Sequence, residues 1–211
     1  MSNLATEECD LRYSMLAGLK EHLRIRGYST SNLSFEHSLI AAAHVSTVGF
    51  CRQLIDAGAS PLVIDERGNS PLTRAAHSGL TDICKLLLEV GVPVDHALPG
   101  NKTPLVAACE SAKIEVVKTL IEAGANVNYQ CKAGWRVIHY AARGGSVEIG
   151  KLLISAGANL HDKVHSVSVG EVSLVQVARA CEKYEFVAWL ESDVLNASTS
   201  PIQVRGRKVR L

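Results

Sequence analysis

Residues 100–132 read GNKTPLVAACESAKIEVVKTLIEAGANVNYQCK, and this stretch decides the fold because it predicts one complete pair of helices. Thr103 can cap a helix that begins at Pro104. Proline suits the first helical position because its φ is preset and it lacks only an amide that would have no partner. Leu105 and Ala108 then lie at helical spacing on one face. The first half of the stretch therefore predicts a short amphipathic helix.

The second half of the same stretch predicts another helix and a turn. Gly124 is the residue type that ends helices in a left-handed conformation. The ANVNYQCKAG segment after it alternates polar and apolar residues before a further glycine, which favours a turn or short hairpin. The residues expected to face inward from this second helix are Ile114, Val117, Leu120 and Ile121.

The same pattern recurs along the chain with a period of 33 residues. Because one helix pair cannot bury its own apolar face, the units are expected to stack, and small side chains are needed where backbones approach. Five sets of similar residues, which we call columns, recur at this spacing, and coincidence does not explain five such sets. The columns are Gly58, Gly91, Gly124 and Gly157; Leu54, Leu87, Leu120 and Leu153; Phe50, Ile83, Val116 and Ile149; Leu39, Leu72, Leu105 and Ile138; and Ala42, Ala75, Ala108 and Ala141.

The SPLTRAAHSG, TPLVAACESA, GANVN and GANLH segments resemble the ankyrin repeat, whose pattern is G-x-T-P-L-H-x-A-A followed by L-L-x-x-G-A-x-V-N. The resemblance covers about residues 34–193, which is most of the chain. It implies an all-α repeat solenoid in which stacked antiparallel helix pairs are joined by β-turn or hairpin loops. The motif is specific to a fold and does not identify a partner.

The repeats divide the chain into three predicted regions. Residues 1–33 are expected to form an N-terminal capping helix and connector, residues 34–193 the repeat domain, and residues 194–211 a flexible basic tail. The five units are expected at 34–66, 67–99, 100–132, 133–165 and 166–193.

Two units depart from the pattern in ways that affect the prediction. The fourth has Arg136-Val137 in place of Thr-Pro, so its first helix is expected to be poorly capped. The fifth begins its helix at Ser173, 37 residues after Arg136, so the HDKVHSVSVGEV segment (161–172) contains four extra residues. Glu191 stands where the other units have an apolar residue, as suits a terminal unit with nothing stacked beyond it.

The N-terminal segment has a helical apolar stripe of its own, which we expect to cap the first unit. The alternative is a free amphipathic helix that meets a membrane or a partner. The stripe consists of Leu11, Met15, Leu19 and Leu23.

Composition indicates an ordinary folded protein, with 47% hydrophobic and 20% charged residues and a net charge of +1. Residues 196–211 hold four of the 22 basic residues and no acid, which leaves 18 basic against 21 acidic residues, about −3, for the rest. No stretch approaches the roughly 20 apolar residues of a membrane span, and the N-terminus lacks a secretory pattern. The six cysteines form no CxxC pair and are expected to be reduced core thiols. We expect a cytoplasmic protein, with a nuclear location also open.

Motifs for catalysis, phosphate binding or metal binding are not evident, so no enzymatic activity and no cofactor are expected. His161 and His165 could ligate one metal from a helix, but they fall in the inserted segment without an evident third ligand, so loop histidines are favoured. His139 matches the histidine of the ankyrin pattern, which implies a structural hydrogen bond. Asn196 begins a glycosylation sequon that is expected to be unused. The VRGRKVR tail is a weak candidate for nucleic-acid binding.

Partner recognition is implied by the resemblance on the concave surface formed by the turn tips and the first helix of each pair. Residues at these positions vary between units while the packing columns do not. The candidates at the tips are Glu66, Arg67, Asn69, Lys102, Lys132 and Trp135, and those on the first helices are His44, His77, Ser78, Glu110 and Arg143.

Trp135 is the strongest candidate because the other units have polar residues at its position, which predicts an exposed ring. Arg136, Tyr140 and Arg143 flank it, and aromatic residues and arginines are enriched at the centres of interfaces. The alternative is that Trp135 folds onto the adjacent hairpin, against the inserted segment.

These observations favour a non-enzymatic adaptor, inhibitor or scaffold that binds another protein and is monomeric on its own. A bacterial toxin-immunity protein or a pathogen effector would use the same binding mode. Two alternatives of other classes remain open: an enzyme or metal site in the insert at 161–171, and nucleic-acid association through the basic tail.

Overall fold

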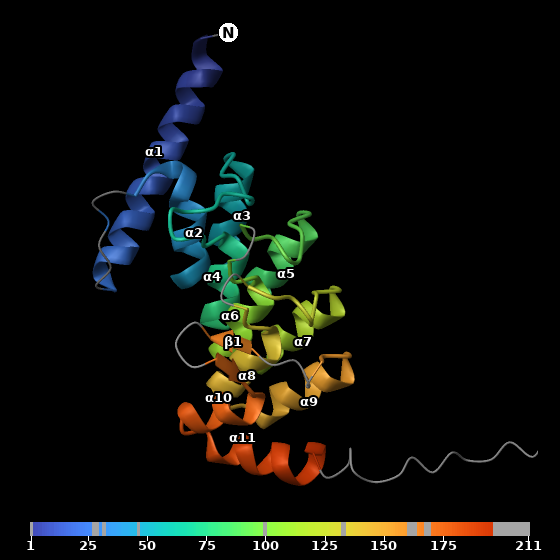
Figure 1. The fold of residues 1–211 in the computed structure, drawn as a ribbon. Helices are drawn as coiled ribbons and strands as arrows, with labels where there is room; N and C mark the ends of the chain where they lie inside the picture. Colours follow the sequence, from blue (N-terminus) through green and yellow to red (C-terminus); the bar gives the residue numbers. More distant parts are fainter. Residues whose placement is uncertain are drawn as a thin grey trace, which may run out of the picture.

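The computed structural model describes residues 2–26, 30, 33–45, 47–98, 101–131, 134–159, 164–166 and 170–195, with the side chains of 2–9, 36, 164–166, 170–172 and 193–195 left out of the description. Within these residues the chain is a helical solenoid in which five antiparallel helix pairs stack along one axis (Figure 1). The predicted fold class is confirmed.

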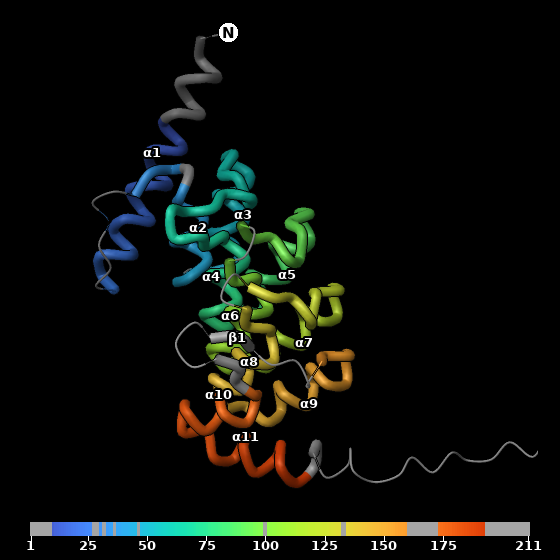
Figure 2. Tube along the Cα trace, in the orientation of Figure 1, coloured from blue at the N-terminus to red at the C-terminus, as the bar shows by residue number. Residues whose placement is uncertain are grey.

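The helices form two rows. The first helices of the pairs contact one another in order, and the second helices form a parallel row beside them (Figure 2). The first row comprises α2 (Phe35–Val45), α4 (Pro71–Ser78), α6 (Pro104–Glu110), α8 (Val137–Gly144) and α10 (Leu174–Ala180), and the second comprises α3 (Val48–Asp56), α5 (Thr81–Glu89), α7 (Ile114–Glu122), α9 (Val147–Ser155) and α11 (Tyr184–Trp189).

The third unit forms as its sequence predicts. Thr103 caps α6, because its side chain accepts a hydrogen bond from the backbone N–H of Val106, and Pro104 is the first helical residue. The second helix, α7, ends at Glu122, and Gly124 follows with a φ of 86°, the left-handed conformation that glycine adopts without a steric cost. Beyond it, Cys131 donates its backbone N–H to the carbonyl of Trp135 and closes the expected hairpin turn.

The columns of the repeat form the core. Leucines at the same position in successive first helices are fully buried, and the alanines beside them allow the helices to approach closely. Cysteines occupy some of these buried positions: burial raises the pKa of Cys51 to about 11 and that of Cys84 to about 12. Their thiols therefore behave as small apolar core groups.

The N-terminal helix α1 (Ser2–Ile25) packs beside α2 and covers the open side of the first unit. Leu19 and Leu23 are buried there and Met15 packs against the core, as the stripe predicted. Leu11 differs: it is 54% exposed, because the helix extends beyond the end of the first unit. Arg12 anchors the helix near this point by donating its Nε–H to the carbonyl of Ala57, 2.9 Å away.

In the fourth unit the Arg136 side chain provides no cap, as predicted, but a contact that was not predicted closes the first turn of α8. The backbone N–H of Arg136 donates to Nδ1 of His139, and the backbone N–H of His139 donates to the carbonyl of Arg136, at 3.3 and 3.0 Å. The cap therefore comes from inside the helix, where sequence reasoning looked only at the residue before it. His139 is 1% exposed and makes the structural hydrogen bond that the resemblance implied.

The inserted segment before the fifth unit contains a short antiparallel hairpin of β1 (Val164–Ser166) and β2 (Gly170–Val172), in which Val164 pairs with Val172. After α11 the chain continues as one π-helical segment, η1 (Leu190–Leu195). Glu191 is exposed and pairs with Arg179, as expected for a terminal unit. Residues 194–195 of the predicted tail belong to η1, and residues 196–211, with all its basic side chains, lie outside the described residues.

Candidate functional site

A hollow of about 620 Å³ lies between the turn tips and the first helices of the second, third and fourth units. Turn residues form one wall, and the exposed faces of α4, α6 and α8 form the other. Five of the predicted binding residues line it, namely Arg67, Asn69, His77, Lys102 and Glu110.

The turn before α4 is held rigid by a carboxylate. Asp65 Oδ1 accepts hydrogen bonds from the backbone N–H groups of Arg67 and Asn69, at 2.9 and 2.8 Å, and Asn69 Nδ2 donates to the same carboxylate. The Asp65 carboxylate is therefore occupied within its own turn, and the turn presents the Arg67 side chain to solvent. Glu66, at the tip of this turn, is exposed and does not line the hollow.

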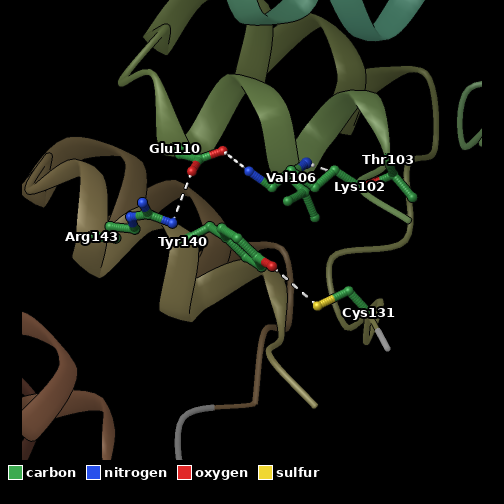
Figure 3. A network of polar contacts seen from close by, with 7 residues as sticks. All are labelled: Lys102, Thr103, Val106, Glu110, Cys131, Tyr140 and Arg143. Atoms are coloured by element: carbon green, nitrogen blue, oxygen red, sulfur yellow. Dashed lines mark hydrogen bonds and ion pairs between the residues drawn. The ribbon is translucent and has the colours of Figure 1, made fainter. Parts of the chain in front are cut away.

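Lys102, Glu110 and Arg143 form a polar network between the third and fourth units (Figure 3). Lys102 Nζ lies 2.5 Å from Glu110 Oε2, and an Arg143 guanidinium nitrogen lies 3.0 Å from Glu110 Oε1. The Glu110 side chain is 17% exposed, against 45% and 52% for its two partners. One carboxylate thus accepts from two cations, and the network links the tip of one unit with the first helices of two.

Tyr140 provides the floor of the hollow beside this network. Its side chain is 6% exposed, and its hydroxyl lies 3.1 Å from Cys131 Sγ (Figure 3). Lys102 Nζ lies 5.5 Å from the centroid of its ring. Burial, with smaller contributions from Cys131 and Glu110, raises the pKa of Tyr140 well above its ordinary value, so the phenol stays neutral.

The prediction that Trp135 is exposed is wrong. Its ring is half-buried and packs at a tilt on Tyr140, with 5.4 Å between ring centroids, and on His139 at 6.1 Å. The reason is that Tyr140 replaces the smaller Ala107 of the preceding unit and offers the indole an apolar surface. Trp135 therefore supports the side of the hollow from the fourth tip.

The remaining candidates are His44, Ser78 and Lys132. His44 and Ser78 hydrogen-bond to each other through Nδ1 and Oγ, which joins α2 to the end of α4 next to the hollow. Burial, and then the positive charges of Arg74 and His77, lower the pKa of His44. Lys132 lies outside the described residues.

Sequence reasoning missed Arg74 and the lining role of Tyr140. Both occupy one position of the repeat, directly before the alanine pair, where the successive units have Ala41, Arg74, Ala107 and Tyr140. The variation at this position was the available signal, and only the positions after the alanine pair were considered.

Other chemistries have no site among the described residues. No group of three or more histidine, cysteine or acidic side chains is placed to hold a metal ion there, and the side chains of His161 and His165 lie outside the description. None of the described helices combines the length and apolar character needed to cross a membrane.

The comparison with protein families agrees with this architecture. The family described as ankyrin repeats (3 copies) matches residues 38–131 and 91–164. No curated protein matches the chain. The two matched segments together cover more than half of the sequence and coincide with the units that form the hollow, so the chain belongs to the ankyrin-repeat family.

Proposed function

We propose that the chain is a non-enzymatic module that binds one partner protein in the hollow between the turn tips and the first helices of its second to fourth units. Ankyrin repeats generally mediate protein–protein interactions and are typically not enzymes. In this proposal the chain acts as a monomeric adaptor, inhibitor or scaffold in the cytoplasm.

The observation that carries the proposal is the distribution of variable residues. The packing columns repeat in every unit, whereas the residues that line the hollow differ from unit to unit. Side chains that contribute to stacking have to be similar in successive units, so variation concentrated on one concave surface indicates specialisation for a ligand. The stack of units is also long enough to supply the roughly 800 Å² that each partner contributes to a standard interface.

A position-specific crosslinking experiment tests the proposal. A photoreactive p-benzoylphenylalanine replaces His77, which is exposed at the hollow, or Lys85, which is exposed on α5 in the second row of helices. Irradiation in native lysate should attach a partner to the His77 position and not to the Lys85 position. Equal capture at both positions, or capture at Lys85 alone, would contradict the proposed binding surface.

Trp135→Ala provides the matching energetic test. We expect the variant to weaken binding of the captured partner, because the indole supports the fourth turn tip beside the hollow. Because the ring also packs on Tyr140, the free energy of unfolding is measured in parallel by urea titration. A variant that loses stability but binds the partner unchanged would remove Trp135 from the binding surface.

A further inference from the structure

The hollow carries more positive charge than the rest of the chain suggests. Arg67, Arg74 and Lys102 line it, and Glu110 is the one carboxylate among its lining residues. Outside the basic tail the sequence is slightly acidic, so a concentration of cations here is a local feature and not a consequence of overall charge.

The cations of the hollow differ in what they contact. Lys102 already pairs with Glu110, which Arg143 also contacts, so its charge is compensated inside the protein. Arg67 and Arg74, by contrast, have no carboxylate within 4.0 Å among the described side chains. Glu66 precedes Arg67 directly but forms no ion pair with it among the described side chains, and Asp65 is engaged with the backbone and side chain of its own turn.

Arg74 is the most informative of these residues. Its Nε is buried and has no hydrogen-bond partner within the described part of the chain. A buried guanidinium N–H without an acceptor is costly, and a bound acceptor from another molecule is one way in which native proteins satisfy such a group. Arg74 reaches the hollow from α4, beside Ala107, so an incoming acceptor can approach it there.

We propose that the hollow recognises an acidic peptide segment of the partner, with a carboxylate on the guanidinium groups of Arg74 and Arg67. This inference rests on the proposed function and specifies the chemistry of the bound segment. A carboxylate fits because the planar guanidinium donates two parallel hydrogen bonds to it. Next to this contact, the buried side chains of Tyr140 and Ala107 form the apolar floor of the hollow.

The same observations favour a peptide over a nucleic acid. A phosphate chain carries a negative charge on every unit, and Glu110 in the wall of the hollow would repel it. The lysine that could neutralise a second phosphate is already paired with that glutamate. A segment with one or two carboxylates can pair with Arg67 and Arg74 and brings fewer negative charges near Glu110 than a phosphate chain does.

The test uses the full chain and a phage-displayed library of random 12-residue peptides. Selection should enrich peptides that contain Asp or Glu next to an apolar residue. A selected peptide is then synthesised with a fluorescent label, together with a version in which its acidic residues are changed to the corresponding amides. Fluorescence anisotropy should show affinity at least tenfold lower for the amide peptide, the size expected for loss of a charge-assisted hydrogen bond.

Matched variants locate the contact. Arg74→Gln should weaken binding of the acidic peptide at least tenfold, while Arg74→Lys, which keeps the charge, should retain part of the affinity. Arg52→Gln removes an exposed arginine from α3, where Arg52 pairs with Glu89, and should leave binding unchanged. Circular dichroism of each variant confirms that the helices are intact.

The outcomes separate this inference from the proposed function. One outcome is that the selected peptides show no acidic bias while the bulky change His77→Trp still blocks their binding. This result would overturn the acidic specificity and leave the binding hollow in place. Peptides that bind equally to His77→Trp, or a failure of selection to enrich any peptide, would count against both. If single-stranded polyuridylic acid displaced the peptide, and this competition depended on Arg74, the ligand would be a nucleic acid and the inference would be overturned.

Discussion

At the scale of single residues, His44 joins two neighbouring helices of the first row beside the hollow. Its imidazole bonds to Ser78 of the next unit, and burial together with Arg74 and His77 lowers its pKa below the ordinary 6.5. The folded chain therefore holds this histidine neutral at pH values where the unfolded chain already protonates it. As pH falls below about 6.5, the unfolded state binds more protons, and the stability of the folded state decreases.

This linkage predicts a pH-dependent effect of His44→Gln. At pH 7.5 the variant should be less stable than the wild type, because it loses the packing and the hydrogen bond of the neutral imidazole. At pH 5.0 the difference should shrink, since only the wild type is destabilised by protonation at this position. Thermal unfolding followed by circular dichroism at both pH values measures the gap, and a gap that stays constant or widens toward pH 5.0 would contradict the assignment.

The sequence was least able to predict the contacts of individual side chains. The pattern placed Arg67, Asn69, His77, Lys102 and Glu110 at the hollow because register alone fixes which backbone positions face it. It could not place the Trp135 ring, because the direction of that side chain depends on Tyr140, one turn into the next helix. Contacts between side chains of different columns are not encoded in the spacing of any one column.

At the scale of elements, caps and helix ends were predictable where they use common residue types. Thr103 and the left-handed Gly124 follow from local chemistry alone. The cap of α8 was missed because a histidine inside the helix provides the acceptor. The β1–β2 hairpin was missed because four additional residues in the period indicate an insertion and do not specify its conformation.

The junction between the last two units depends on one glycine. Gly150 lies inside α9, and a Cβ atom there would come within 2.5 Å of the Trp189 ring and 3.0 Å of the Phe186 ring. The first three units have Cys51, Cys84 and Val117 at this position, so glycine is needed only where the large aromatic residues of α11 pack. Close approach of the two helices, and not backbone conformation, accounts for this glycine.

Gly150→Ala should therefore destabilise the chain, although alanine stabilises an ordinary helix interior by about 0.5–1 kcal/mol relative to glycine. Gly18→Ala in α1 is the matched control, because a Cβ atom at Gly18 meets nothing within 4 Å, and it should be neutral or stabilising. Urea unfolding measures both changes, and Trp189 fluorescence in a Trp135→Phe background reports displacement of the indole. Equal stabilisation by the two substitutions would show that α11 moves away from the added methyl group without a loss of stability.

At the scale of the whole molecule, the stack is nearly one-dimensional, because each unit contacts only its neighbours and the ends differ from the middle. The first unit is covered by α1 and the last ends in η1, so the second to fourth units have a neighbour on both sides. The hollow lies over these inner units. The proposed binding surface therefore lies where the scaffold is most constrained, which would lower the ordering cost of binding.

This arrangement predicts that the loss of stability caused by a core truncation spreads over different units, depending on where in the stack the truncation lies. Leu120 in α7 and Phe186 in α11 are both fully buried, and truncation to alanine should cost about 2–5 kcal/mol for each. Leu120→Ala should reduce hydrogen-exchange protection in the third unit and in both of its neighbours, because each neighbour loses an interface. Phe186→Ala should reduce protection only in the fourth and fifth units, with the second unit unchanged.

Native-state hydrogen exchange resolved by mass spectrometry distinguishes this behaviour from global cooperativity. If Phe186→Ala lowered protection equally in α4 and α11, the chain would unfold as one unit and the nearest-neighbour description would fail. If the description holds, Phe186→Ala should also leave most of the binding in the hollow intact, because Arg74 and Lys102 belong to units that the change does not reach and only Tyr140 belongs to the fourth. The same variant thus shows whether recognition depends on the inner units alone or on the complete stack.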